Sequence, residues 1–222
     1  MFKLTSATLI LFWAAPVPPA APVCVLPPLA AASLRVEYNA TEGTAALVLE
    51  AESDEAVRRV RLIAPGGSSL LDLSRPPGQG LSISGLSIET DDSQLGSLFE
   101  AYPEGTYEVR ALAVGGGRIL GSATLSHELP QPPVIGFPGA GTVGVPTSGL
   151  LLVWTGSPAA DGYEVALEQG ENDGLRIRLP PGSTSFLVPD GFLAPSTPTQ
   201  VEIAAISGNG NRTSTVVEFT TD

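Results

Sequence analysis

Short runs of alternating apolar and polar residues, separated by glycine and proline, dominate the chain after its first 32 residues. Such alternation predicts half-buried β-strands, and the intervening glycines and prolines predict turns. In the first half, the strands expected from this pattern cover residues 34–38, 45–52, 57–63, 69–73, 81–88, 106–114 and 118–126. Residues 93–102 instead carry apolar side chains at i, i+3 and i+4, which predicts one short helix over the end of a sandwich.

The second half repeats the pattern, and Gly208-Asn-Gly-Asn211 predicts a tight hairpin before the last strand. Its expected strands cover residues 149–154, 162–168, 175–179, 184–188, 201–205 and 214–219. Between the halves, residues 129–133 contain three prolines in Leu-Pro-Gln-Pro-Pro, which predicts a stiff linker. We therefore expect an all-β protein of two tandem antiparallel sandwiches, at residues 33–128 and 134–222, set end to end.

The second half resembles a fibronectin type III domain through four features of its sequence. These are Trp154 in the second strand, Tyr163 in the third, Leu193-x-Pro195-x-Thr197 before the sixth, and Phe219-Thr-Thr221 at the close. The resemblance implies a seven-stranded, two-sheet sandwich with the tryptophan in its core, used for adhesion, spacing or ligand binding. Thr199 stands where the family has a tyrosine, so the tyrosine-corner hydrogen bond should be absent or replaced.

The first half resembles an immunoglobulin or fibronectin sandwich only in general. Pro103-Glu-Gly-Thr-Tyr107 is similar to a tyrosine corner, but this half has no tryptophan for its core. Turns and alternation therefore support the same sandwich architecture without a specific motif.

The N-terminus has the pattern of a secretory signal peptide. Lys3 precedes about a dozen mainly apolar residues, which is too short for a membrane span of about 20 residues. Small residues at 30–32 predict a signal peptide of residues 1–32, with an earlier cut after Ala20 or Ala21 as the alternative. The residues before Cys24 do not suit a lipobox, which disfavours a lipid anchor there. We expect a secreted or periplasmic protein without a transmembrane segment in the mature chain.

Charge and cysteine content exclude several kinds of function. The net charge is −12, and without the signal peptide 10 arginines face 23 acidic residues, a net charge of −13. A surface of that sign repels phosphate backbones, so we expect no nucleic-acid partner. The single cysteine lies in the signal peptide, which leaves the mature chain without disulfides, zinc–thiolate sites or cysteine nucleophiles.

Few residues suggest catalysis or metal binding. His127 is the only histidine and no Gly-x-Ser-x-Gly motif occurs, so we expect no catalytic residue and place His127 at the surface or between the domains. Glu89, Asp91 and Asp92 are the candidates for a calcium site, although we favour the alternative that such acids are solvated strand ends. No other cofactor is expected.

Arg59 and Arg61 share one strand face, where they could hold an anion. We favour the alternative that they pair with Glu50 and Glu52 on a neighbouring strand.

These observations together predict a monomeric, noncatalytic binding, adhesion or spacer protein, whose partner is a protein or a glycan. One alternative is a small secreted hydrolase that uses acidic loop residues with calcium. Another is an accessory subunit associated with the cell envelope.

Overall fold

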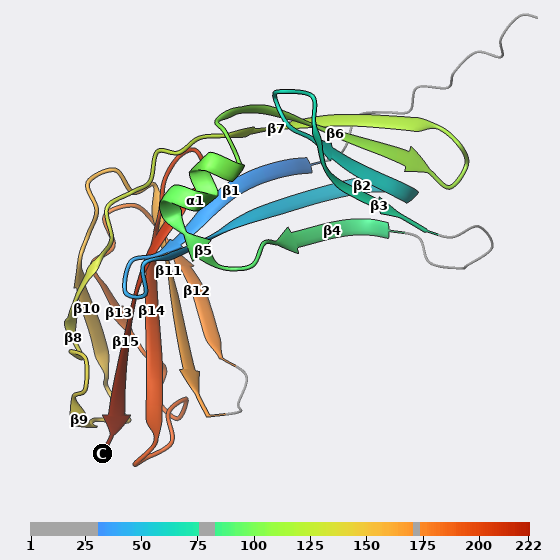
Figure 1. Ribbon diagram of the computed structural model, residues 1–222. Helices are drawn as coiled ribbons and strands as arrows, with labels where there is room; N and C mark the ends of the chain where they lie inside the picture. The colour runs from blue at the N-terminus through green and yellow to red at the C-terminus, as the bar shows by residue number, and fades with distance from the viewer. Residues whose placement is uncertain (1–30, 76–82, 171–173) are drawn as a thin grey trace, which may run out of the picture.

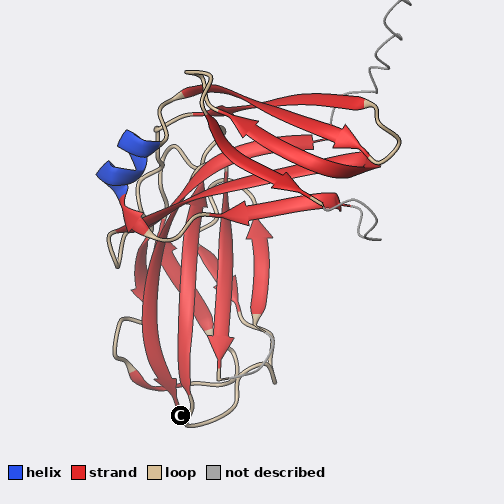
Figure 2. Ribbon diagram, turned by 45° about the vertical axis from the view of Figure 1, so that its right-hand side comes forward, coloured by secondary structure: helices blue, strands red, loops and turns tan. Residues whose placement is uncertain are grey.

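The computed structural model describes residues 31–75, 83–170 and 174–222. The predicted signal peptide, apart from its last two residues, lies outside the described residues. Two β-sandwiches form the arms of an L, which Figures 1 and 2 show from two sides. Each arm has its own cluster of buried apolar side chains.

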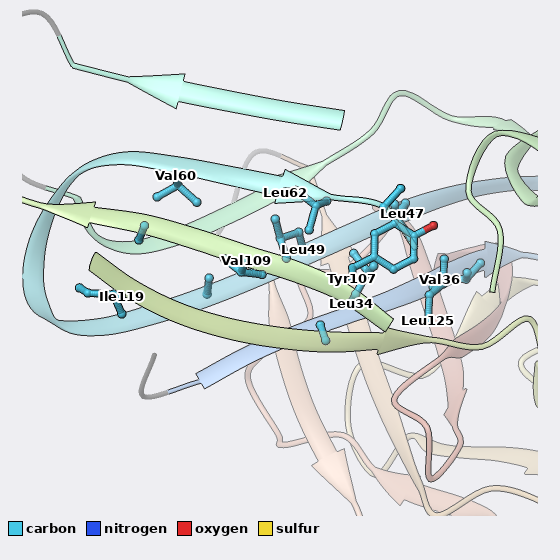
Figure 3. Close-up of a cluster of buried hydrophobic side chains, with 14 of the residues drawn as sticks. Leu34, Val36, Leu47, Leu49, Val60, Leu62, Tyr107, Val109, Ile119 and Leu125 are labelled. Atoms are coloured by element: carbon cyan, nitrogen blue, oxygen red, sulfur yellow. The ribbon is translucent and has the colours of Figure 1, made fainter. Parts of the chain in front are cut away.

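The first arm follows the predicted order of strands and one short helix. Its elements are β1 (Ala31–Asn39), β2 (Thr44–Ile63), β3 (Ser69–Ser74), β4 (Ile83–Glu89), β5 (Ser93–Gln94), α1 (Leu95–Ala101), β6 (Gly105–Ala113) and β7 (Arg118–Leu125). The predicted strands 45–52 and 57–63 are continuous in β2, which turns back on itself between Glu52 and Val57 (Figure 3). The first half of β2 pairs with β1 and β4 in one layer of the sandwich, and its second half pairs with β3 and β6 in the other layer. The strand β2 therefore belongs to both layers.

Apolar side chains from both layers of the first arm meet in its core (Figure 3). Leu34 and Leu49 come from one layer, and Leu62 and Val109 come from the other. Tyr107 is fully buried, and its hydroxyl donates a hydrogen bond to the carbonyl of Pro103 over 2.8 Å. The tyrosine corner predicted from residues 103–107 is therefore confirmed.

The second arm is a sandwich of a three-stranded layer on a four-stranded layer. Its strands are β8 (Val134–Phe137), β9 (Val143–Val145), β10 (Leu151–Thr155), β11 (Gly162–Gln169), β12 (Leu175–Leu179), β13 (Ser185–Leu187), β14 (Pro198–Ile206) and β15 (Arg212–Thr221). The layers have the orders β13-β10-β8 and β12-β11-β14-β15, and β9 adds to the edge of β15. Trp154 is 2% exposed, and its ring centroid lies 5.8 Å from that of Tyr163. The tryptophan thus occupies the core, as the resemblance implies.

Thr199 takes part in a different hydrogen-bond arrangement from a tyrosine corner. The side chain of Gln169 donates to the Thr199 hydroxyl over 2.8 Å and to the Ala194 carbonyl over 3.1 Å, and it accepts from the Ala194 amide. Gln169 is 4% exposed, so these bonds fasten the end of β11 to the loop before β14. The tyrosine corner of this arm is replaced, as predicted.

A strand pairing joins the two arms directly. β1 runs parallel to β15, with Glu37 opposite Arg212 and Asn39 opposite Ser214. The order β12-β11-β14-β15-β1-β2-β6-β7 therefore forms one sheet across the L. The proline-rich linker predicts domains set end to end with limited flexing, whereas the two arms form an L in which β1 pairs with the free edge of β15.

Candidate interdomain site

A polar pocket of about 310 Å³ lies at the elbow, where the four-stranded layer of the second arm meets β1, β2 and β4 of the first arm. Small side chains in its lining are those of Ala46, Ala204 and Ser214. Charged side chains also line it: Glu37, Glu89, Asp92, Glu164, Glu202, Arg176 and Arg212. Because both arms contribute residues, this pocket exists only while the elbow is formed.

Glu164 on β11 is the most buried charged group of the pocket, with a side chain that is 7% exposed. It forms ion pairs with Arg176, with Arg212 at 3.3 Å and with Arg178 at 3.4 Å. Burial acts to raise the pKa of Glu164, but the hydrogen bond from Arg176 and the charges of Arg212 and Arg176 outweigh it and lower the pKa. The carboxylate therefore stays ionised.

Arg212 carries this network from one arm to the other. One of its terminal nitrogens, Nη1, lies 3.3 Å from Glu164 and 3.5 Å from Glu37 of β1. Glu37 in turn pairs with Arg35 at 2.7 Å, and Arg35 pairs with Glu50 at 2.9 Å. The hydrogen bond from Arg35 lowers the pKa of Glu50. A chain of alternating charges thus runs from β11 to β2.

Asn211 forms a second polar joint beside this network. Its side-chain oxygen accepts from the Val36 amide over 2.8 Å, and its side-chain nitrogen donates to the carbonyls of Ser126 and Glu128, each over 2.8 Å. The residue is 1% exposed. One side chain of the second arm therefore satisfies three backbone groups of the first arm and the linker. The sequence marked Asn211 as the end of a hairpin turn and as part of a glycosylation triplet, so its role in the joint was missed.

The arginines of β2 have a partner that the sequence did not indicate. Arg59 donates two hydrogen bonds to Asp72, and Arg61 lies 3.3 Å from the same carboxylate. The predicted pairing with Glu50 and Glu52 is wrong, because both glutamates precede the turn in β2 and lie in the other layer. Asp72 lies on β3, directly opposite Arg61.

His127 packs against the short helix of the first arm. Its ring stacks on Phe99 with centroids 3.9 Å apart, and Nε2 lies 2.8 Å from the Tyr102 carbonyl oxygen. Its backbone amide donates to the carboxylate of Glu104 over 2.6 Å. These contacts hold α1 to the start of the linker, which is a packing role.

The predicted calcium candidates lie near the mouth of the elbow. Glu89 and Asp92 line the pocket, while Asp91 is exposed beside them. In residues 31–75, 83–170 and 174–222, no three His, Cys, Asp or Glu side chains are placed to hold a metal ion. The calcium site at Glu89, Asp91 and Asp92 stays a prediction.

We expect calcium to leave the stability of the protein nearly unchanged. Calcium binds through about six to eight converging oxygen ligands, and the described residues bring no three acidic side chains together in that way. A melting curve with millimolar calcium and another with a chelator should agree within about 1 °C. A shift of several degrees that disappears in the double variant Glu89→Gln, Asp92→Asn would contradict this expectation and establish the site.

Comparisons with known proteins give similar structures but no similar sequences. No protein-family model matches the chain, and no curated protein sequence matches it. Similar solved structures include fibronectin(III)-like modules of CbhA from Clostridium thermocellum, with a TM-score of 0.36 and 10% identity over 87% of this chain and 93% of that one. A two-domain fibronectin type III segment of chicken tenascin has a TM-score of 0.33 and 15% identity over 85% and 97%.

A third similar structure is a tetra-tandem repeat from the extending region of a large adhesion protein. Its TM-score is 0.33 and its identity 18%, over 86% of this chain and 50% of that one. The sandwich fold of each arm is shown by the chain's own layers, strand orders and buried tryptophan. Within the described residues, no helix has the length and apolar character needed to cross a membrane.

Proposed function

We propose that this chain is a secreted, noncatalytic spacer of two sandwich modules, which presents its outer faces at an angle fixed by the elbow. The observation that carries the proposal is the parallel pairing of β1 with β15, which makes one sheet of strands from both arms. Two modules joined only by a linker move relative to each other by default. A shared sheet removes that freedom.

The polar joints at the elbow add to this rigidity. Asn211 fixes the backbone of β1 and of the linker through three hydrogen bonds. Thr41 and Val216 form two hydrogen bonds between the arms. The Val216 amide donates to the Thr41 hydroxyl over 2.9 Å, and that hydroxyl donates to the Val216 carbonyl. Each such bond contributes about 1 kcal/mol, and together they oppose any hinge motion.

The chemistry of the pocket also favours a structural role over catalysis. A general acid or base at neutral pH needs a pKa near 7. The pKa of Glu164 is lowered instead, and its ion pairs with Arg176 and Arg212 hold it as a carboxylate. Its charge therefore stabilises the joint rather than moving a proton.

Spin labels on the two arms test whether the elbow is rigid, because they report the distance between the arms. Val114 and Ala140 are exposed and lie in loops of the first and second arm, so both can be replaced by cysteine in a Cys24→Ser background. Pulsed electron paramagnetic resonance should then give one narrow distance distribution. A distribution as broad as that of two linked, independent modules would refute the proposal. Single-label samples control for contacts between molecules.

A further inference from the structure

The outer face of the first arm carries four arginines on three neighbouring strands. Arg59 and Arg61 lie on β2, Arg110 on β6 and Arg118 on β7, and all four line one open groove of about 500 Å³. We name this surface the arginine face. It points away from the core, because the residues that alternate with these arginines, such as Val60, are buried there.

The strand register places the arginines beside one another in two rows. Arg61 is directly opposite Arg110 on the neighbouring strand. In the next row, Leu112 is opposite Arg59 on one side and Arg118 on the other. Like charges directly opposite each other destabilise a sheet, so an anion that lies over these rows relieves a repulsion present in the free protein.

Carboxylates on the same face neutralise half of this charge. Asp72 serves both arginines of β2, and Glu108 pairs with Arg110. Among the described residues, Arg118 makes no ion pair within 4 Å. Four arginines against two carboxylates leave a surplus of two positive charges, although the whole chain has a net charge of −12.

The arginines also keep hydrogen-bond donors available for a ligand. The side chains of Arg59, Arg61 and Arg110 are 45%, 39% and 51% exposed. Each guanidinium has five N–H donors, and the described carboxylates occupy at most two of them in any one of these arginines. Arg59 binds Asp72 through two parallel hydrogen bonds, the arrangement in which guanidinium groups bind a carboxylate of any source.

The charges are too widely spread for one small anion. Strands in a sheet lie about 4.8 Å apart, and side chains on one face recur about every 7 Å along a strand. Two rows on three strands therefore require several anionic groups held in one molecule. Leu112 and Leu120 lie among the arginines, and Leu120 is 52% exposed, which adds apolar contact between the charged positions. An acidic polysaccharide has both features, because its anionic groups recur along a chain of sugar rings with apolar C–H surfaces.

The position of the arginine face within the sheet argues against an acidic peptide. An extended peptide commonly binds a sheet by adding a strand to a free edge. At the centre of the arginine face, β6 has β2 on one side and β7 on the other, so its backbone is already paired. Only side chains are offered to a ligand here, which suits a polysaccharide.

We propose that the arginine face binds an acidic polysaccharide through the carboxylate groups of its sugars. The proposal goes beyond the spacer function and rests on it only in that a secreted protein meets such polymers outside the cell. The net negative charge of the chain opposes the approach of a polyanion, but screening limits that repulsion to about 8 Å at physiological ionic strength. Binding is therefore weak, depends on the four arginines, and weakens as salt is added.

Affinity electrophoresis through gels that contain sodium polygalacturonate tests the proposal, with neutral dextran gels as the reference. The wild-type chain should be retarded, and the double variant Arg110→Gln, Arg118→Gln should bind at least about tenfold more weakly. Arg118→Gln alone breaks no ion pair among the described residues and should already weaken binding. Glu108→Gln should tighten binding several-fold, because it removes a carboxylate that competes with the ligand for Arg110. A purely structural role of Glu108 predicts no such gain.

The matched control, Arg176→Gln with Arg178→Gln, makes the same change in net charge at two exposed arginines of the other arm and should bind as the wild type does. Wild-type protein retarded no more by polygalacturonate than by dextran overturns the proposal, and so does an equal effect of the two double variants. Tighter binding to poly-glutamate than to polygalacturonate also overturns it, in favour of an acidic protein partner. The spin-label distances report on the elbow independently, so mobile arms with intact polysaccharide binding would refute the spacer function alone.

Discussion

Replacing Asn211 with alanine should lower the free energy of unfolding by about 3 kcal/mol, which is the largest effect we expect from one polar residue. The change removes three hydrogen bonds of 2.8 Å at a residue that is 1% exposed. The Val36 amide and the Ser126 and Glu128 carbonyls would lose a partner in a region that water reaches poorly. Chemical denaturation measures the change.

Asn211→Asp distinguishes the hydrogen bond that the Asn211 side chain accepts from the two hydrogen bonds that it donates. Aspartate can still accept from the Val36 amide, but it cannot donate to the two carbonyls and places negative charge against them. It should therefore destabilise the protein at least as much as alanine does. Asn39→Ala is the control, because the side chain of Asn39, at the end of β1, accepts hydrogen bonds from the nearby amides of Thr41 and Glu42. A loss below about 0.5 kcal/mol for both Asn211 variants would show that the joint contributes little.

Replacing Glu164 with glutamine should lower the free energy of unfolding by about 2 kcal/mol at neutral pH. The change leaves Arg212, whose side chain is 14% exposed, with Glu37 as its remaining carboxylate at the elbow. Arg176 and Arg178 are exposed and can return to water, which keeps the loss moderate. Glu202→Gln is the control, because Glu202 lines the same pocket without an ion pair and should change stability by less than about 0.5 kcal/mol.

The same residue gives the stability a dependence on pH. Because the pKa of Glu164 is lower in the folded protein than its ordinary value of 4.5, the unfolded chain binds the proton more readily. The contribution of Glu164 is therefore complete above that value and is lost as the pH falls through the lowered pKa. The difference in free energy of unfolding between wild type and Glu164→Gln should therefore shrink progressively as the pH falls below 4.5. Denaturation at a series of pH values measures this difference, and a difference that stays constant would contradict the assignment.

Local sequence patterns predicted the parts of the fold that short stretches determine. The alternation in β11 and β12, the core position of Trp154 and the corner at Tyr107 all depend on residues close together in the chain. The arginines of β2 were found, and Pro65-Gly66-Gly67 predicts a hairpin that brings β3 beside them, but Asp72 was not assigned to them. The partner of an exposed charge depends on strand order, which alternation does not specify.

The elbow could not be predicted in the same way. Glu164 and Arg212 occupy positions that alternate as ordinary surface residues do, and they are buried at the elbow, where the two arms meet. Among the predicted acids, Glu89 and Asp92 do line the pocket, whereas the residues that join the arms were not singled out. These residues meet because β1 pairs with β15, and no sequence motif in either strand predicts that pairing.

The pairing of β1 with β15 also sets the order of events when this chain folds. Val36 and Asn211, which meet at the elbow, are 175 positions apart in the sequence. Contacts of such long range form late, because the chain between them must first lose much of its freedom. During synthesis, β1 has no partner on that side until β15 is made. The first arm must therefore remain soluble with one edge open until β15 pairs with that edge.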